Sequence, residues 1–251
     1  MKHYIITGAS RGFGRYLAEA LAEDNTTFHL VARSNMREVQ ESIENKGGKV
    51  HVHHADLSDT HKLPGLNHDI FKKIDRQQTE YIVLVNNAGM LEPVGPVGKY
   101  DPETYRRSLE VNFTAPLLLT YLFVHAVQDW TCRKQVVMIS SGAAIKAYYG
   151  WSNYCSTKAG LNRFTETLAL EQKGFKHPVE AFAFNPGRID TQMQNVIREQ
   201  SADDFPLVDD FIRSKEKGHL GDPVKIAAKL VRLMNDGNVP AGKMIVAAEM
   251  E

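Results

Sequence analysis

The sequence predicts one α/β domain built on a doubly wound parallel sheet with helices on both faces. Short runs of β-branched and other apolar residues alternate with longer amphipathic segments along the whole chain, and this alternation implies parallel strands joined by right-handed crossovers. The predicted strands are apolar at nearly every position, as expected for a sheet that helices cover on both sides. A chain of 251 residues that is 43% hydrophobic can bury the core of one large domain.

The predicted elements follow one another with no repeat, low-complexity tract or linker between them. We expect strands at residues 3–7, 27–33, 49–55, 81–85, 135–141, 179–184 and 244–247. We expect helices at residues 13–24, 36–46, 67–78, 102–129, 152–172, 203–217 and 223–235. Residues 185–219 depart from the alternation, because they contain Pro186, Pro206 and a mixed polar composition, and we expect a mobile insertion that covers the substrate. Residues 1–251 are otherwise expected to form a single domain.

Charge and composition narrow the possible partners. The 30 basic and 30 acidic side chains balance to zero without a long run of either sign, which argues against nucleic acid. The longest apolar stretch, residues 115–127, is too short and interrupted to span a bilayer, and the first strand leaves no room for a signal peptide. The two cysteines, Cys132 and Cys155, form no disulfide framework, which agrees with a reducing compartment. We therefore expect a cytoplasmic protein with no membrane or nucleic-acid partner.

A glycine-rich turn, Thr7-Gly8-Ala9-Ser10-Arg11-Gly12-Phe13-Gly14, follows the first predicted strand and opens the first helix. Glycines allow a tight turn and a close approach of ligand to backbone, and the free amides at a helix start suit a pyrophosphate. The carboxyl ends of the strands are also where open parallel sheets bind ligands. We therefore expect a dinucleotide at this turn, held by Gly8, Ser10, Arg11, Gly12, Phe13 and Gly14.

The end of the second predicted strand indicates which dinucleotide binds. Proteins that choose NAD usually offer a carboxylate about 20 residues past the glycines, to bind the ribose 2′-hydroxyl. No carboxylate occurs between Asp24 and Glu38, whereas Arg33 and Ser34 end the strand. Arg33, together with Arg11, can hold a 2′-phosphate through charge-assisted bonds. We therefore predict NADPH in preference to NADH; the alternative is that both arginines are ordinary solvated side chains.

Polar residues also follow the third and fourth predicted strands. Asp56 and Leu57 end the third, where the carboxylate can accept a hydrogen bond from an adenine amine, and Asn86-Asn87-Ala88-Gly89 ends the fourth, small enough to lie along a nucleotide. The nearby His51, His53 and His54 lack other ligands at metal-binding spacing and suit a strand, so we expect no metal.

Tyr154 and Lys158 lie four residues apart in a predicted helix, so their side chains project from the same face. A cation within a few ångströms favours a phenolate and lowers the pKa of the tyrosine toward the working range. Ser141 ends a predicted strand and can meet the start of this helix across a cleft. Tyr-x-x-x-Lys alone is usually a solvated helix face, but here it accompanies the other motifs. Asn112 lies in the long helix before it, where an asparagine usually bonds to backbone or solvent.

Taken together, these motifs and Asn185-Pro186-Gly187 make the chain resemble the short-chain dehydrogenase/reductase family from residue 3 to about residue 191. The resemblance implies a Rossmann-type fold that binds NAD(P). It implies that Tyr154 is the general acid/base, that Ser141 orients the substrate carbonyl, that Lys158 binds the nicotinamide ribose and that Asn112 holds a proton-relay water. The remaining cofactor contacts expected from the family are Asn87, Ala88, Gly89, Pro186, Gly187, Ile189 and Thr191.

A closer likeness is to the sepiapterin reductase-like branch, which includes benzil and diketone reductases. The residues that carry it are 87–94, 150–155 and 190–194. The pterin reductases of that branch anchor the pterin with a carboxylate in the last strand, where this chain has Val246, so we expect a less polar carbonyl compound. We expect the pocket to be lined by Ala143, Ile145, Tyr148, Tyr149, Trp151 and Met193; core packing is the alternative for each aromatic residue.

These observations predict an NADPH-dependent reductase of a ketone or 1,2-diketone, with Tyr154 as the proton donor. The family also implies a homo-oligomer, either a dimer or a tetramer, built by packing of the helices around residues 104–126 and 154–170. Two alternatives remain open. One is a catalytically silent NADPH-sensing protein, and the other is a reductase of ketones linked to an acyl carrier protein, which requires a basic docking patch near the pocket.

Overall fold

The computed structural model describes residues 1–237 and 239–250 and contains one seven-stranded parallel sheet with the strand order β3-β2-β1-β4-β5-β6-β7. The strands are β1 (Lys2–Thr7), β2 (Thr26–Ala32), β3 (Lys49–His54), β4 (Tyr81–Asn86), β5 (Arg133–Ile139), β6 (Glu180–Asn185) and β7 (Met244–Val246). The order proceeds outward from β1 in both directions, so the predicted doubly wound sheet is confirmed.

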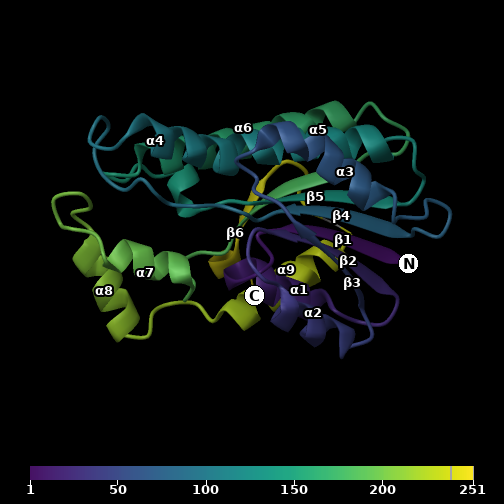
Figure 1. Cartoon of the computed structure of the whole chain (residues 1–251), viewed down its shortest axis with the longest axis horizontal. Coiled ribbons are helices and arrows are strands. Elements are labelled where there is room, and N and C mark those ends of the chain that lie inside the picture. Colours follow the sequence, from purple (N-terminus) through teal and green to yellow (C-terminus); the bar gives the residue numbers. More distant parts are fainter. Residues whose placement is uncertain (238, 251) are drawn as a thin grey trace.

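Helices cover both faces of this sheet (Figure 1). One layer consists of α1 (Gly12–Leu21), α2 (Arg37–Glu44) and α9 (Pro223–Asn235). The other consists of α3 (Leu63–Phe71), α4 (Pro102–Leu109), α5 (Ala115–Val127) and α6 (Ser152–Gln172). The last two helices, α7 (Gln192–Arg198) and α8 (Val208–Glu216), lie beyond the carboxyl edge of the sheet and away from both layers (Figure 1).

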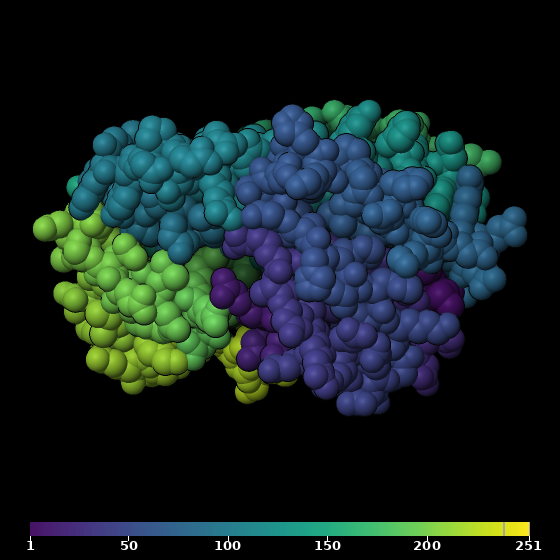
Figure 2. Space-filling view, viewed as in Figure 1, coloured from purple at the N-terminus to yellow at the C-terminus, as the bar shows by residue number. Residues whose placement is uncertain are grey.

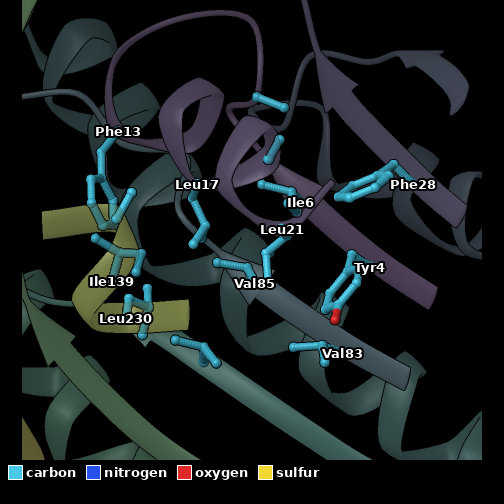
Figure 3. Close-up of a cluster of buried hydrophobic side chains, with 14 of the residues drawn as sticks. Tyr4, Ile6, Phe13, Leu17, Leu21, Phe28, Val83, Val85, Ile139 and Leu230 are labelled. Atoms are coloured by element: carbon cyan, nitrogen blue, oxygen red, sulfur yellow. The ribbon is translucent and has the colours of Figure 1, made fainter. Parts of the chain in front are cut away.

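Alternation along β1 divides the core into two parts. Tyr4 and Ile6 face α1 and α9, where they pack among Leu17 and Leu230 (Figure 3). Ile5, on the opposite face, belongs to the second cluster, which includes side chains of α5 and α6. Because successive side chains of a strand point to opposite faces, a strand covered on both sides must be apolar throughout.

A third buried cluster fills the space between the carboxyl edge of the sheet and helices α7 and α8. Trp151, Phe205 and Phe211 form its centre, and Leu91 and Val94 from the loop after β4 complete it. Residues 185–219, called the covering segment below, therefore bury apolar side chains of their own. The helix predicted at residues 203–217 begins only at Val208, and α7 was not predicted, because seven residues show too little periodicity.

Of the other predicted helices, one is displaced along the sequence and one is interrupted, while those predicted at residues 13–24 and 36–46 end earlier, at Leu21 and Glu44. The helix predicted at residues 67–78 lies at Leu63–Phe71, with Pro64 in its first turn, where the missing N–H costs no hydrogen bond. The helix predicted at residues 102–129 ends at Val127 and contains a π-helical turn at Glu110–Thr114. By length and composition this stretch, Pro102–Val127, could cross a membrane, but it packs as α4 and α5 in the layer over the sheet.

Candidate active site

The glycine-rich turn packs against the end of β4. Gly8 and Gly12 have positive φ angles of 67° and 59°, which glycine adopts without strain. A Cβ atom on Gly14 would lie 2.4 Å from Asn87 Nδ2, and one on Gly8 would lie 2.8 Å from Ala88 Cα. The phenyl ring of Phe13 is buried and stacks on Phe184 in the core, so only its backbone can face a ligand. The turn therefore has the shape of a cradle that side chains at Gly8 and Gly14 would distort.

Thr7 and Asn87 hold the turn in place. Thr7 Oγ1 accepts hydrogen bonds from the amides of Asn87 and Ala88, both at 3.0 Å. Asn87 Nδ2 donates to the carbonyl oxygens of Thr7 at 2.9 Å and of Gly8 at 3.2 Å. Thr7 was not among the predicted site residues, although a hydroxyl at the last position of an apolar strand is a signal that could have identified it.

The ends of β2 and β3 form the region predicted to bind the adenosine half. Arg33 Nη1 lies 3.6 Å from Asp56 Oδ2, and Arg107 Nη2 donates to the same oxygen at 2.9 Å. Burial raises the pKa of Asp56, but hydrogen bonds from Ser58 and the two guanidiniums outweigh burial, so that its pKa lies below the ordinary range. Arg107 was not predicted, because nothing in the sequence places α4 beside β3.

Ser34 and Leu57 complete this region. The Ser34 hydroxyl donates to the Ser10 hydroxyl at 2.8 Å, which joins the end of β2 to the glycine-rich turn. The Leu57 side chain is buried in the second cluster, which leaves its backbone to line the site. Arg11 is exposed beside them. The two predicted phosphate-binding arginines thus lie on elements that meet through Ser10 and Ser34.

Ser141 and Tyr154 meet as predicted, in a buried environment. The Tyr154 side chain is 7% exposed, and Ser141 follows β5 with its Oγ accepting from the Ala143 amide at 3.2 Å. Burial raises the pKa of Tyr154 to about 12, and a hydrogen bond from Ser141 acts in the opposite direction. The expectation that the neighbouring cation lowers the pKa of Tyr154 is therefore wrong for this structure, because burial is the larger effect.

Lys158 is as deeply buried as Tyr154. Its Nζ donates to the Ile139 carbonyl at 2.8 Å and lies 5.6 Å from the centre of the Tyr154 ring. Burial lowers the pKa of Lys158 to about 8. Near neutral pH this ammonium therefore remains mostly protonated, one helical turn from the phenol.

Asn112 lies in the π-helical turn, with no exposed surface. Its Oδ1 accepts from the Met90 amide at 2.8 Å, and its Nδ2 donates to the Met90 carbonyl at 2.7 Å. A Cβ on Gly89 would lie 3.4 Å from Asn112 Oδ1 and 3.9 Å from Lys158 Nζ, so that these groups surround the loop after β4. The side chain of Asn112 is thus used to fix Met90. A π-helical turn within an α-helix is common at functional sites.

The start of the covering segment approaches the glycine-rich turn. The Gly187 amide donates to Asn185 Oδ1 at 2.9 Å, which shapes the turn after Pro186. Thr191 Cγ2 would lie 3.8 Å from a Cβ on Gly12. The Ile189 side chain is buried in the first core cluster, so its backbone alone can contact a cofactor. These positions bring the turn at residues 185–191 to the predicted cofactor site.

The predicted pocket residues divide into two groups. Ala143, Tyr148, Trp151 and Met193 belong to or contact the buried third cluster with Tyr154. Tyr149 and Ile145 are 57% and 75% exposed, so they do not form part of this enclosed wall, contrary to expectation. Their loop turns outward between Ser141 and Trp151, a path that residue type alone does not reveal. Figure 2 shows a hollow in the surface where the covering segment (green) approaches the N-terminal part of the chain (purple).

Neither the histidine cluster at residues 51–54 nor the thiol of Cys155 belongs to this site. Within residues 1–237 and 239–250, no group of three or more His, Cys, Asp or Glu side chains could hold a metal ion. The Cys155 thiol donates to the Lys146 carbonyl at 3.7 Å, and burial raises its pKa. A raised pKa makes this thiol a weak nucleophile.

Comparison with known proteins gives consistent results. A family model described as short chain dehydrogenase matches residues 2–202. Benzil reductase ((S)-benzoin forming) of Bacillus cereus is 37% identical over 245 residues, covering 98% of each chain. Sepiapterin reductase of Meriones unguiculatus is 32% identical over 95% of this chain and 93% of its own. A solved short-chain dehydrogenase/reductase from Saccharomyces cerevisiae has a TM-score of 0.83 at 27% identity, covering 99% of this chain and 97% of that one.

Proposed function

Since the chain belongs to the short-chain dehydrogenase family, we propose that it is an NADPH-dependent reductase of aromatic ketones or 1,2-diketones, with Tyr154 as the proton donor. The observation that carries the proposal is the meeting of Ser141, Tyr154 and Lys158 beside a buried aromatic cluster. A phenol, a hydroxyl and an ammonium at one point supply what carbonyl reduction requires of the protein.

When bound, NADPH would supply the hydride that reduces the carbonyl carbon. Tyr154 Oη gives its proton to the carbonyl oxygen, and its high pKa keeps that proton in place at neutral pH. The Ser141 Oγ accepts from Ala143, and its single hydroxyl hydrogen, which is donated to Tyr154 in this structure, would turn to the developing alkoxide once the substrate is bound. The Lys158 ammonium stabilises the phenolate that remains.

Removal of the Tyr154 hydroxyl tests this role directly. In Tyr154→Phe the ring and its packing against Trp151 remain, but no proton donor is present. We expect the rate of benzil reduction to fall by a factor of about 10² to 10⁴. Cys155→Ala, one residue away on the same helix, is the control and should retain activity. A Tyr154→Phe enzyme with the wild-type rate would contradict the assignment.

The proposed preference for NADPH rests on two observations. Arg33 and Arg11 can bind a 2′-phosphate, and the end of β2 carries no carboxylate that could bind a ribose 2′-hydroxyl. Arg33 and Arg107 both lie beside Asp56, at 3.6 and 2.9 Å, so two cations are present where the adenosine half is expected to bind. Arg33→Ala should raise KM for NADPH and leave KM for NADH unchanged. Arg37→Ala is a matched control, because Arg37 pairs with Glu41 on α2. An unchanged cofactor preference in Arg33→Ala would remove Arg33 from this role.

The substrate class rests on the apolar wall around Tyr154 and on Val246 at the end of β7. The resemblance to a benzil reductase and to sepiapterin reductases supports a carbonyl compound with an aromatic or dicarbonyl group. NADPH consumption should therefore be measured with benzil, sepiapterin, an acetoacetyl thioester and an aliphatic ketone. Benzil is expected to be the best substrate. Strong preference for sepiapterin would show that Val246 does not exclude a pterin.

One observation favours a second candidate function, the reduction of ketones carried as thioesters. A shallow polar pocket of about 250 Å³ on the covering segment is lined by Arg188, Arg213 and Lys217, together with Asp210, Ser214 and His219. Asp210 pairs with Arg213, and the arginine and lysine side chains suit an acidic carrier protein or a phosphate group. Turnover of the acetoacetyl thioester well above that of benzil would favour this function. Binding of NADPH without reduction of any compound would instead favour a sensor.

We also propose that the protein forms a homodimer or homotetramer through the layer of α4, α5 and α6. Apolar side chains project from this layer into solvent, with Tyr121 65% exposed and Leu170 63% exposed, and Leu109 and Leu118 accompany them. Large apolar side chains left exposed on one helical layer are typical of an interface. Light scattering should give a mass of two or four chains, and Tyr121→Asp should lower it.

A further inference from the structure

Three loops meet at Asp204, at the carboxyl edge of the sheet. They are residues 87–101 after β4, residues 140–151 after β5 and residues 199–207 between α7 and α8. The Gly95 amide donates to the Gly150 carbonyl at 2.8 Å. A Cβ on Gly150 would lie 2.2 Å from the Asp204 carbonyl oxygen, and one on Gly95 would lie 3.0 Å from Asp204 Oδ1. Both glycines have positive φ, so glycine is needed for this contact, here called the three-loop junction.

One ion pair crosses the junction. Lys99 Nζ donates to Asp204 Oδ1, and Ser201 Oγ donates to Asp204 Oδ2 at 3.0 Å. The bond from Lys99 holds the pKa of Asp204 below its usual range, so the pair is charged at neutral pH. Among the ion pairs of residues 1–237 and 239–250, this is the one that joins the covering segment to the rest of the chain, since Arg213–Asp210 and Lys215–Asp190 lie within the segment.

The junction is connected to the proton donor through two aromatic side chains. Phe205 follows Asp204 directly, has no exposed surface and stacks on Trp151 with ring centres 4.7 Å apart and an angle of 2°. Trp151 follows Gly150 and meets the Tyr154 ring edge-on at 5.8 Å. The Trp151 carbonyl accepts from the Cys155 amide at 2.8 Å, in the first turn of α6. The position of the three-loop junction therefore determines the positions of Trp151 and Phe205, which form an aromatic wall beside Tyr154.

We propose that Asp204 is a positioning residue that, through its ion pair with Lys99, holds the Trp151–Phe205 wall against the substrate and so determines substrate fit. This inference rests on the proposed reductase function. The pair is partly exposed, with the Lys99 side chain 48% and the Asp204 side chain 12% accessible, so it contributes little to overall stability. It can still bias a local opening of the covering segment, because such openings need far less free energy than global unfolding.

Kinetics of Lys99→Met and Asp204→Asn with benzil and NADPH test the proposal. Each variant should raise KM for benzil about two- to five-fold, because loss of one partly exposed ion pair shifts an equilibrium constant by a factor of this size. The kcat and the KM for NADPH should not change, and Lys99→Arg should keep the wild-type KM. Added salt should raise KM for benzil in the wild type and have no effect in Asp204→Asn, because salt screens exposed charges. Arg37→Met, which breaks an exposed pair with Glu41 inside α2, is the matched control.

Hydrogen exchange gives a second measurement that needs no activity. Backbone amides of residues 199–212 should exchange faster in Lys99→Met and Asp204→Asn than in the wild type and Arg37→Met, while amides of β1 and β4 exchange alike in all four proteins. If the wild type reduces no carbonyl compound, the proposed function fails while exchange still tests the junction. Unchanged exchange in both variants, or faster exchange with an unchanged KM for benzil, would overturn the positioning role.

Discussion

Lowering the pH from 7 to 5 should destabilise this protein through four histidines on adjacent strands. His3 lies on β1, His29 on β2, and His51 and His53 on β3. The centre of the His29 ring is 5.9, 5.1 and 5.6 Å from those of His3, His51 and His53. His3 Nδ1 and His29 Nε2 are buried without a hydrogen-bond partner. Protonation of such a cluster requires both desolvation and repulsion between like charges.

The size of the effect follows from the two most buried histidines. Burial lowers the pKa of His3 to about 4 and of His29 to about 2, and neighbouring positive charges act in the same direction. An unfolded histidine has a pKa of about 6.5, so at pH 5 the unfolded chain binds more protons than the folded one. Stability is therefore complete above pH about 6.5 and is lost as the pH falls toward the folded values. Each of these two histidines lowers the free energy of unfolding by about 2 kcal/mol at pH 5.

Other charged groups face the cluster as well. The N-terminal amino group opposes protonation of His3 and Lys73 that of His29, whereas Asp69 favours protonation of His53. They change the size of the effect of the histidines but not its sign.

Urea unfolding at pH 7, 6 and 5 checks this prediction. The wild type should lose about 4 kcal/mol between pH 7 and 5, and His3→Phe, which keeps a ring of similar size, should lose about half of that. The two proteins are compared by the slope of the unfolding free energy against pH, because the substitution also alters packing and so changes the absolute stability. His219→Gln changes an exposed histidine on the covering segment and is the control. A wild-type stability that is constant from pH 7 to 5, or a His3→Phe slope equal to that of the wild type, would refute the reasoning.

Three further predictions concern the cofactor turn, a buried lysine and the active-site ammonium. Gly14→Ala should lower stability by about 1 to 3 kcal/mol and raise KM for NADPH, because its Cβ would lie 2.4 Å from Asn87 Nδ2; melting temperature and kinetics measure both. Lys134→Met should cost about 3 kcal/mol or more in urea unfolding, since three carbonyl oxygens lose their donor, whereas the exposed Lys176→Met should cost almost nothing. Carbonyl reduction should slow above pH about 8 as Lys158 loses its proton, and a kcat/KM profile that is flat to pH 10 would contradict this.

Much of the fold could be predicted because its strands are apolar throughout and their ends carry turn residues. The helix predicted at residues 152–172 matches α6, and that at residues 223–235 matches α9, whose first turn contains Pro223 after the capping Asp222. The predicted strands differ from the observed ones by one or two residues at their ends. Local pattern and the rule for parallel sheets therefore suffice for the architecture and for the edge that carries the site.

The remaining features depend on contacts between distant segments. Arg107 reaches Asp56 across 51 positions, and Thr7 binds the backbone at residues 87 and 88, neither of which a periodic pattern encodes. The π-helical turn at Glu110–Thr114 leaves the apolar pattern of its helix intact, so the sequence predicts a plain helix. The sequence motif places Lys158 beside Tyr154, but their pKa values depend on burial, which the motif does not reveal.

Burial of the phenol and the ammonium together bears on the direction of the proposed reaction. Reduction of a carbonyl needs Tyr154 with its proton, whereas oxidation of the alcohol needs the phenolate as a base. Burial raises the pKa of Tyr154 to about 12 and lowers that of Lys158 to about 8, so both shifts favour the uncharged form of their group. At neutral pH the phenol is almost fully protonated, and Lys158 still carries the charge that will stabilise the phenolate once the proton has left. The site is thus prepared to donate a proton rather than to accept one, which favours reduction over oxidation.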